Sequence, residues 1–251
     1  MSKPLLEVRA LRKSFGALRA SDGIDLEIRE GETHAVIGPN GAGKTTLIAQ
    51  LAGELRPDSG RVRFAGEDIT ALSAPERARR GLARSFQITS IYADFSALEN
   101  VMLAVQAHAG SSFRFWRPAR EEAALRLPAR AILEELGLGG RVDAPAASLA
   151  HGEQRRLEIA MALAGGPRLV LLDEPVAGMG AEETRRMIEF LSTLKGGKTL
   201  ILVEHDMDAV FSLADRISVL VYGCIIATGR PAEIRANPEV RRAYLGDEVA
   251  A

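Results

Sequence analysis

A glycine-rich segment that could bind phosphate groups lies at residues 38–46. It reads Gly38-Pro39-Asn40-Gly41-Ala42-Gly43-Lys44-Thr45-Thr46 and matches the spacing G-x-x-x-x-G-K-T. Glycines allow backbone conformations in which successive N–H groups point at phosphate oxygens, and a helix that follows presents its positive end to the same anion. The segment therefore predicts a nucleoside triphosphate site, against the alternative of a chance match of the spacing.

The polar side chains at the end of this segment have separate expected roles. The ammonium of Lys44 would lie along the β- and γ-phosphates, the hydroxyl of Thr45 would ligate Mg²⁺, and Thr46 would make a further phosphate contact. A second acidic site suits the same chemistry, because Asp173 and Glu174 directly follow the hydrophobic run Leu169–Leu172. We expect Asp173 to hold Mg²⁺ through its water shell and Glu174 to polarise the attacking water. An ordinary strand-ending turn is the alternative for this acidic pair.

Alternating strands and helices must position these groups. Strands are expected at Leu5–Val8, Ile24–Ile28, Ala35–Ile37, Arg61–Phe64, Leu82–Phe86, Leu169–Leu172 and Thr199–Val203, with a closing pair around Gly223. Helices are expected at Leu47–Leu51, Ser73–Arg80, Ser96–Ala107, Arg120–Leu136, Arg155–Ala164, Ala181–Lys195 and Met207–Leu213, with Pro128 kinking or breaking the fourth. Buried strands that alternate with helices indicate an α/β core. We expect one domain over residues 1–251, in which a helical insertion at 88–166 interrupts a core formed by 1–87 and 167–251.

Composition limits the classes of function. The chain has 32 Lys and Arg against 33 Asp and Glu, a net charge of −1, which gives no bulk attraction to nucleic acid or anionic lipid. The lone Cys224 excludes an internal disulfide and is expected to be a buried small hydrophobe in a reducing cytosol. No secretory signal opens the sequence, and its apolar runs fall short of the ~20 residues that cross a bilayer. At a membrane, the protein would therefore act through a partner.

Further motifs accompany the phosphate loop and the acidic pair, and they are Phe15, Gln87, Leu149–Gln154 and Val203–Asp206. In order and spacing, these motifs resemble the nucleotide-binding subunit of an ATP-binding cassette (ABC) transporter. The resemblance covers nearly the whole chain and implies a P-loop NTPase core with an antiparallel β layer and an inserted helical subdomain. It implies that Phe15 stacks on adenine, that Gln87 senses Mg²⁺ and contacts the membrane subunit, that Ala150, Gly152 and Glu153 of the signature motif Leu149–Gln154 contact nucleotide, and that His205 is the switch histidine. The implied catalytic set is Lys44, Gln87, Glu174 and His205, and the implied magnesium set is Thr45, Gln87 and Asp173.

Three departures from the family pattern affect the expected site. Ala150 stands where the signature commonly has serine, which removes a hydroxyl donor to the γ-phosphate. Gly180 stands where the family usually has Asp or Asn, so communication between paired sites is in doubt. Phe15 replaces the commoner tyrosine, a mild change for stacking.

Details within the family resemble the ATPases of high-affinity branched-chain amino-acid importers. They are Leu149-Ala150 in the signature, Val203–Met207 and the tail Ile234–Gly246. The alternatives are a lipopolysaccharide-export ATPase, which has a similar tail, and a soluble cassette ATPase acting on nucleic acid or ribosomes. The segment Ile88–Tyr92 would suit docking of a membrane partner's helix, and a packed core loop is the equal alternative.

The importer resemblance also implies cofactors, partners and a location. It implies ATP and Mg²⁺, transmembrane permease subunits, a second ATPase subunit in a head-to-tail dimer, and a solute-binding protein that acts indirectly. Nucleic acid is not expected as a partner, and the expected place is the cytoplasmic face of the cell membrane. The transported solute, the identity of the permease and the choice between a homodimer and a paired homologue do not follow from the sequence.

Overall fold

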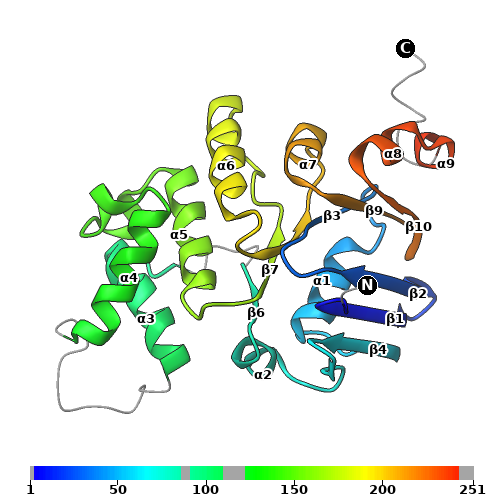
Figure 1. The fold of residues 1–251 in the computed structure, drawn as a ribbon, viewed down its shortest axis with the longest axis horizontal. Helices are drawn as coiled ribbons and strands as arrows, with labels where there is room; N and C mark the ends of the chain where they lie inside the picture. The colour runs from blue at the N-terminus through cyan, green and yellow to red at the C-terminus, as the bar shows by residue number, and fades with distance from the viewer. Residues whose placement is uncertain (1–2, 86–90, 110–121, 243–251) are drawn as a thin grey trace.

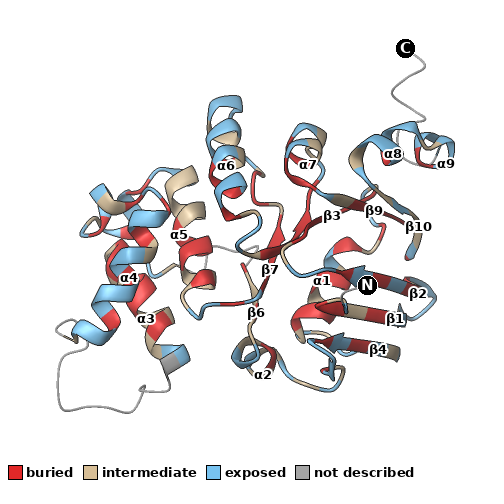
Figure 2. Cartoon of the chain, viewed as in Figure 1, coloured by how far each residue is buried: buried red, intermediate tan, exposed pale blue. Residues whose placement is uncertain are grey.

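A sheet with strand order β10-β9-β3-β8-β7-β6 runs through the middle of the molecule (Figure 1). The structure is a computed structural model that describes residues 3–85, 91–109 and 122–242. The strands are β3 (Thr33–Ile37), β6 (Leu82–Arg84), β7 (Leu169–Asp173), β8 (Thr199–Val203), β9 (Arg216–Val221) and β10 (Cys224–Gly229). All neighbours pair in parallel except β9 and β10. β3, β7 and β8 are buried at every position, because other elements cover both faces of the sheet (Figure 2).

An antiparallel sheet with strand order β2-β1-β4-β5 forms a second layer. Its strands are β1 (Leu6–Phe15), β2 (Leu18–Ile28), β4 (Ser59–Phe64) and β5 (Glu67–Asp68). Helix α1 (Lys44–Ala52) lies between the layers, since Leu47 and Leu51 share one hydrophobic cluster with Leu6 of β1 and Leu171 of β7. The predicted α/β core with an antiparallel layer is therefore confirmed.

Every described element between β6 and β7 is a helix. These are α3 (Ala97–Ala109), α4 (Ala123–Glu135), the short 3₁₀ helices at Gly139–Arg141 and Ala146–Ser148, and α5 (His151–Leu163). α3, α4 and α5 pack on one another and form the green group at one side of Figure 1. These helices lie between β6 and β7 in the chain, and the division into a core and an insertion at residues 88–166 stays a prediction.

The remaining helices cover the sheet and its ends. They are α2 (Ala74–Arg79), α6 (Ala181–Leu194), α7 (Met207–Leu213), α8 (Pro231–Ala236) and α9 (Pro238–Val240). The predicted helix start at Ser96 has the reciprocal hydrogen bonds of a capping box, because Ser96 N donates to Glu99 and Glu99 N donates to the Ser96 hydroxyl. None of the described helices is long and apolar enough to cross a membrane.

Several sequence-based expectations were wrong in detail. α5 begins at His151 and not at Arg155, so the signature glycine lies in the first helical turn. Pro128 does not break α4, because it lies on the exposed side of the helix, where water can bond the carbonyl left without a donor; a kink at Pro128 stays a prediction. Cys224 is exposed and not buried, since the apolar run that contains it folds into two strands and Cys224 opens the edge strand β10. β4 begins at Ser59 and not at Arg61.

Candidate functional site

The predicted phosphate loop joins β3 to α1 and needs glycine at two positions. A Cβ atom at Gly38 would lie 2.0 Å from the carbonyl oxygen of Leu220, and one at Gly43 would lie 2.1 Å from that of Ala20. Gly43 also has a φ of 106°, which side-chain-bearing residues rarely adopt, and it immediately precedes α1. The loop is braced from behind by a hydrogen bond of 2.9 Å from Gly223 N to the carbonyl oxygen of Ala42. A residue with a Cβ at position 38 or 43 would therefore collide with the backbone of Leu220 or Ala20.

Lys44 is buried and folds back over this loop. Its Nζ donates to the carbonyl oxygens of Gly38 at 2.6 Å and Pro39 at 3.0 Å. Burial lowers the pKa of Lys44, and the charges of Glu174 and Asp173 oppose that shift. Thr45, in the first turn of α1, is exposed. The ammonium thus lies among loop carbonyls, where phosphate oxygens could take their place as acceptors.

Asp173 ends β7 with one carboxylate oxygen paired and one unpaired. Its side chain is 1% exposed, and its Oδ2 accepts a hydrogen bond of 3.0 Å from Arg84 Nη2. Its Oδ1 is buried and finds no hydrogen-bond partner among the described residues. Burial raises the pKa of Asp173 above its ordinary value, although Arg84 acts in the opposite direction.

The unpaired oxygen of Asp173 fits a magnesium ion. Mg²⁺ prefers oxygen ligands, keeps several waters and commonly uses one or two carboxylates together with substrate phosphates. The described residues contain no group of three or more His, Cys, Asp or Glu side chains that could hold a metal without other ligands. One buried carboxylate oxygen beside a phosphate loop matches that mode of binding, and the hydroxyl oxygen of the exposed residue Thr45 is a second candidate ligand.

Glu174 and His205 follow adjacent strands and face each other. His205 Nδ1 lies 3.6 Å from Glu174 Oε1, with side-chain exposures of 60% and 32%. Glu174 has a φ of 48°, a left-handed conformation that is uncommon outside glycine. Arg155 stabilises this backbone, because its Nη2 donates to the carbonyl oxygens of Asp173 at 2.7 Å and Glu174 at 3.1 Å. A carboxylate that can accept a proton from water is therefore held at the sheet edge by a strained but well-anchored loop.

The parallel sheet brings the predicted catalytic groups together. The phosphate loop, the Asp173–Glu174 pair and His205 follow the carboxyl ends of β3, β7 and β8, which are neighbours in the sheet. Carboxyl ends of parallel strands meet at one edge, where ligands bind in such folds. Gln87, predicted to sense Mg²⁺, lies outside the described residues.

Glu204 and two arginines were missed by sequence reasoning. Glu204 is buried, and its Oε1 accepts from Val176 N at 2.9 Å while its Oε2 accepts from His205 N at 3.2 Å. It therefore ties the segment after Glu174 to the segment that carries His205. A charged residue between a buried strand and a candidate catalytic histidine was the available signal. Arg84 and Arg155 gave no sequence signal, because their partners are distant in the chain.

The signature segment contains the start of α5, but its capping box is incomplete. Ala150 is the N-cap residue and has no side-chain oxygen, so only half of a capping box forms, through the hydrogen bond of 3.0 Å from Ala150 N to Glu153 Oε2. Glu153 also accepts from Arg141 at 3.3 Å, so its role as a nucleotide contact stays a prediction. Gly152 is half-buried, and a Cβ added there would lie 3.8 Å from Glu183 Oε1, an ordinary van der Waals distance.

Phe15 lies at the end of β1 with 51% of its surface exposed, and Lys13 Nζ is 5.7 Å from its ring centroid. An exposed ring of this kind can stack on a nucleotide base. Gly180, the departure from the family pattern, is the N-cap residue of α6 and has an extended backbone. The adenine contact and the communication between sites stay predictions.

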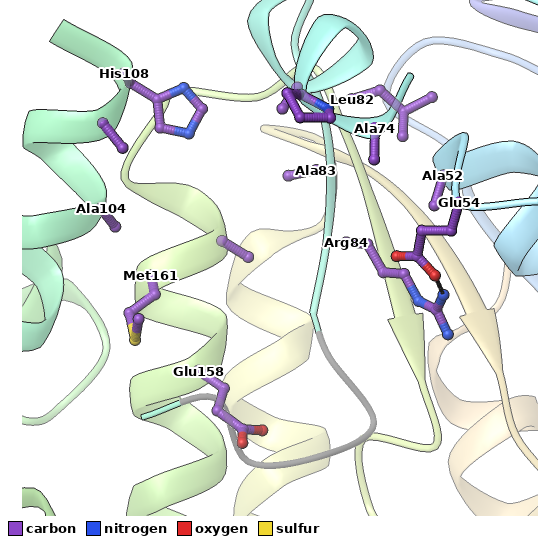
Figure 3. A pocket seen from close by; sticks show the side chains of 14 residues that line it. Ala52, Glu54, Ala74, Leu82, Ala83, Arg84, Ala104, His108, Glu158 and Met161 are labelled. Atoms are coloured by element: carbon purple, nitrogen blue, oxygen red, sulfur yellow. Dashed lines mark hydrogen bonds and ion pairs between the residues drawn. The ribbon is translucent and has the colours of Figure 1, made fainter. Parts of the chain in front are cut away.

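A cavity of about 360 Å³ lies between β6 and α2 on one side and α3 and α5 on the other. Small apolar side chains form most of its wall, including Ala74, Ala78, Ala104 and Ala107. Its charged lining residues are Glu54, Arg84 and Glu158, and Figure 3 shows Arg84 turned toward Glu54.

The predicted docking segment, Ile88–Tyr92, is only partly described, because residues 88–90 lie outside the described residues. Tyr92 is 56% exposed and stacks on Phe95, and Ile91 is half-buried.

Comparison with known proteins identifies the family. A family model described as ABC transporter matches residues 21–177, and one described as branched-chain amino acid ATP-binding cassette transporter matches residues 224–250. The chain is 40% identical over 254 residues to BraF of Pseudomonas aeruginosa, a high-affinity branched-chain amino acid transport ATP-binding protein, with 98% of this chain and 100% of the relative covered. It is 37% identical over 256 residues to LivG of Escherichia coli K12, with the same coverage.

Solved structures agree with this assignment. The ADP conformation of MJ1267, an ATP-binding cassette of an ABC transporter, superposes with a TM-score of 0.86 at 30% identity and covers 98% of this chain and 100% of that chain. A nucleotide-free cassette superposes with a TM-score of 0.85 at 30% identity and covers 96% of this chain and 98% of the other. With a phosphate loop, an acidic strand end and a facing histidine on one sheet edge, the chain belongs to the ABC transporter family, as one of its nucleotide-binding ATPases.

Proposed function

We propose that the chain is the ATP-hydrolysing subunit of an importer for branched-chain or related amino acids, attached to the cytoplasmic face of the cell membrane through permease subunits. The observation that supports hydrolysis most strongly is the meeting of the phosphate loop, Asp173, Glu174 and His205 at one sheet edge. Amino-acid import is supported by relatives that carry that name along their full length and by the match of residues 224–250 to a branched-chain amino acid transporter model.

In this proposal each group at the edge has one task. The backbone N–H groups of the loop and the Lys44 ammonium bind the β- and γ-phosphates, with Phe15 stacked on the base. Thr45, Asp173 and Gln87 would hold Mg²⁺, which would supply positive charge against the phosphate oxygens. Glu174 accepts a proton from the attacking water. His205, whose Nδ1 lies 3.6 Å from the Glu174 carboxylate, orients that carboxylate and contacts the γ-phosphate.

We propose that a second ATPase subunit completes this site. Gly152 and the start of α5 belong to the helical group with α3 and α4, whereas the phosphate loop leads into α1 between the two sheets (Figure 1). A two-fold axis lets the signature segment of each chain face the phosphate loop of the other, which is an isologous arrangement. Helix N-termini attract anions, so the start of α5 at Gly152 would bind the γ-phosphate across this interface.

We propose that the cavity beside Arg84 receives an amphipathic helix from the permease. Its alanine wall permits close approach of a helix, and a basic residue on that helix would compete with Arg84 for Glu54 and with Arg155 for Glu158. The exposed Tyr92 ring extends the apolar surface of the predicted docking segment. A solute-binding protein would act on the permease and not on this chain.

Reconstitution tests the proposed function. The tagged chain is purified from membranes of its own host with associated proteins, placed in proteoliposomes and assayed for ATP-dependent uptake of labelled leucine, isoleucine and valine in the presence of the solute-binding protein. Uptake that is lost in a Glu174→Gln complex is expected. Stimulation of ATPase activity by lipopolysaccharide, nucleic acid or ribosomes, without amino-acid uptake, would overturn the importer assignment in favour of the corresponding alternative.

A further inference from the structure

Arg84 bridges the cavity and the acidic strand end. Its side chain is 10% exposed, its Nη2 donates to Asp173 Oδ2 at 3.0 Å, and its Nη1 pairs with Glu54 Oε2. Figure 3 shows the Arg84 guanidinium directed at Glu54, and both residues line the cavity. One guanidinium therefore contacts a carboxylate at the cavity and a carboxylate at the proposed magnesium site.

The hydrogen bond from Arg84 determines which oxygen of Asp173 remains available to a metal ion. Arg84 takes Oδ2, while Oδ1 is buried and has no hydrogen-bond partner among the described residues. The two oxygens belong to one planar carboxylate and rotate together about the Cβ–Cγ bond. A hydrogen bond that fixes Oδ2 therefore also fixes the direction of Oδ1. Groups that orient metal ligands in this way commonly determine metal affinity without touching the metal.

Glu54 in turn holds Arg84. Glu54 follows the carboxyl end of α1, and its backbone N donates to the carbonyl oxygen of Ala49 at 3.0 Å, which anchors this position. The Nε atom of Arg84 is buried and unpaired within the described chain, so among those residues the hydrogen bonds of the guanidinium go to Glu54 and Asp173. Loss of the Glu54 charge would leave Arg84 fixed at one end only.

We propose that Arg84 is a positioning residue for the magnesium site, which holds Asp173 so that Oδ1 faces the metal, and that Glu54 fixes Arg84 from the cavity side. The inference rests on the magnesium role of Asp173 in the proposed function. Magnesium affinity would then depend on what is bound in the cavity, because a cation of a docked partner would compete with Arg84 for Glu54.

The test measures nucleotide binding and not turnover. In the full-length chain carrying Glu174→Gln, the dissociation constant of a fluorescent ATP analogue is measured with Mg²⁺ and with a chelator, and the ratio of the two gives the gain in affinity due to the metal. Arg84→Gln should reduce this gain about 10-fold, the low end for loss of a group that orients a metal ligand. Its affinity without metal should stay unchanged, because the phosphate loop is intact. Arg84→Lys keeps a cation beside Asp173 and should recover most of the loss, and Glu54→Gln should reduce the gain about 3-fold.

Arg80→Gln is the matched control, because Arg80 also pairs with a glutamate, Glu67, but both are exposed. It should keep the full gain. Circular dichroism checks that each variant is folded, and Glu54→Gln decides the question if Arg84→Gln does not fold. An unchanged metal gain in the folded bridge variants would overturn the role of Arg84 while leaving the proposed function intact. A parent chain whose affinity does not rise with Mg²⁺ would instead overturn the magnesium role of Asp173, and the inference with it.

Discussion

Nδ1 of His205 lies 3.6 Å from Oε1 of Glu174, a pairing that arises because the two residues follow the adjacent parallel strands β8 and β7. Glu204 reinforces it by accepting hydrogen bonds from the backbone N–H of Val176, two residues after Glu174, and from that of His205. The candidate base and the candidate switch residue are thus held by one buried carboxylate.

Glu174→Gln and Lys44→Ala are expected to fail at different steps. Glu174→Gln keeps the shape and loses the base, so ATP should bind normally while turnover falls by at least about 100-fold, the lower limit for loss of a general base. Lys44→Ala removes a charge that contacts phosphate, so binding itself should weaken by about 1.5–3 kcal/mol. Equilibrium binding and steady-state ATPase assays on both variants separate the two effects. Turnover of Glu174→Gln near the parental rate would refute the assigned role.

Ala150→Ser is expected to have two favourable effects. The new hydroxyl can accept from the backbone N–H of Glu153 and complete the half-formed capping box, which should stabilise the chain by about 1 kcal/mol. Its proton remains available to a γ-phosphate, so ATP-driven association of a Glu174→Gln background should tighten modestly. Thermal melting and an ATP titration followed by light scattering measure these effects. Higher stability without tighter association would mean that the hydroxyl serves the helix alone.

Glu204→Gln should damage both stability and turnover. An amide has one oxygen where the carboxylate has two, so one of the backbone N–H groups of Val176 and His205 would lose its acceptor. A buried unsatisfied donor costs about 1–3 kcal/mol, and the displaced loops carry Glu174 and His205. Urea denaturation and kcat are the measurements, with Glu189→Gln on the exposed side of α6 as a control. Unchanged kcat in a folded variant would show that the Glu204 bonds do not position the pair.

Acidification should destabilise the chain through His34. The ring is fully buried in β3, with Nδ1 2.7 Å from Glu32 Oε1 and Nε2 2.8 Å from the Ser218 hydroxyl. Burial lowers the pKa of His34, with Arg216 acting in the same direction and Glu32 in the opposite one. Because the unfolded chain then binds more protons, the free energy of unfolding should fall as the pH drops below about 6.5, the ordinary histidine value.

The measurement for His34 is urea denaturation at several pH values between about 8 and 5.5, above the range in which ordinary carboxylates titrate. A His34→Gln variant should be less stable at pH 8 and should show a smaller loss of stability on acidification than the parent chain. Identical pH dependence in the two proteins would show that His34 does not bind a proton on unfolding.

Sequence motifs predicted the residues at the centre of the site, whereas the contacts around them depend on residues that are distant in the chain. The phosphate loop could be recognised because Gly38 and Gly43 are required by backbone contacts and positive φ, which restrict the residue type directly. The bridge of Arg84 to Asp173 could not, because it depends on β6 and β7 lying side by side although they are far apart in the chain. Cys224 was misjudged for a related reason, since an apolar run does not reveal that part of it forms an edge strand.

A mixture of two inactive chains tests the composite site most directly. One chain carries Lys44→Ala and the other Gly152→Asp, which places a negative charge where the γ-phosphate would approach. Aspartate suits the first turn of a helix, but the added Cβ would lie 3.8 Å from Glu183 Oε1, so circular dichroism must first show that Gly152→Asp is folded. In a head-to-tail heterodimer both defects fall on one site, and the other site keeps an intact Lys44 and an intact Gly152.

The two chains carry different tags, and heterodimers are isolated by successive affinity steps in ATP and Mg²⁺ before their ATPase activity is measured. Each variant alone should be inactive, and the heterodimer should regain part of the parental activity, limited because Gly180 replaces the residue that usually links the sites. Activity of Gly152→Asp alone at the parental rate, or recovery in mixtures that remain monomeric by size-exclusion chromatography, would contradict the composite site.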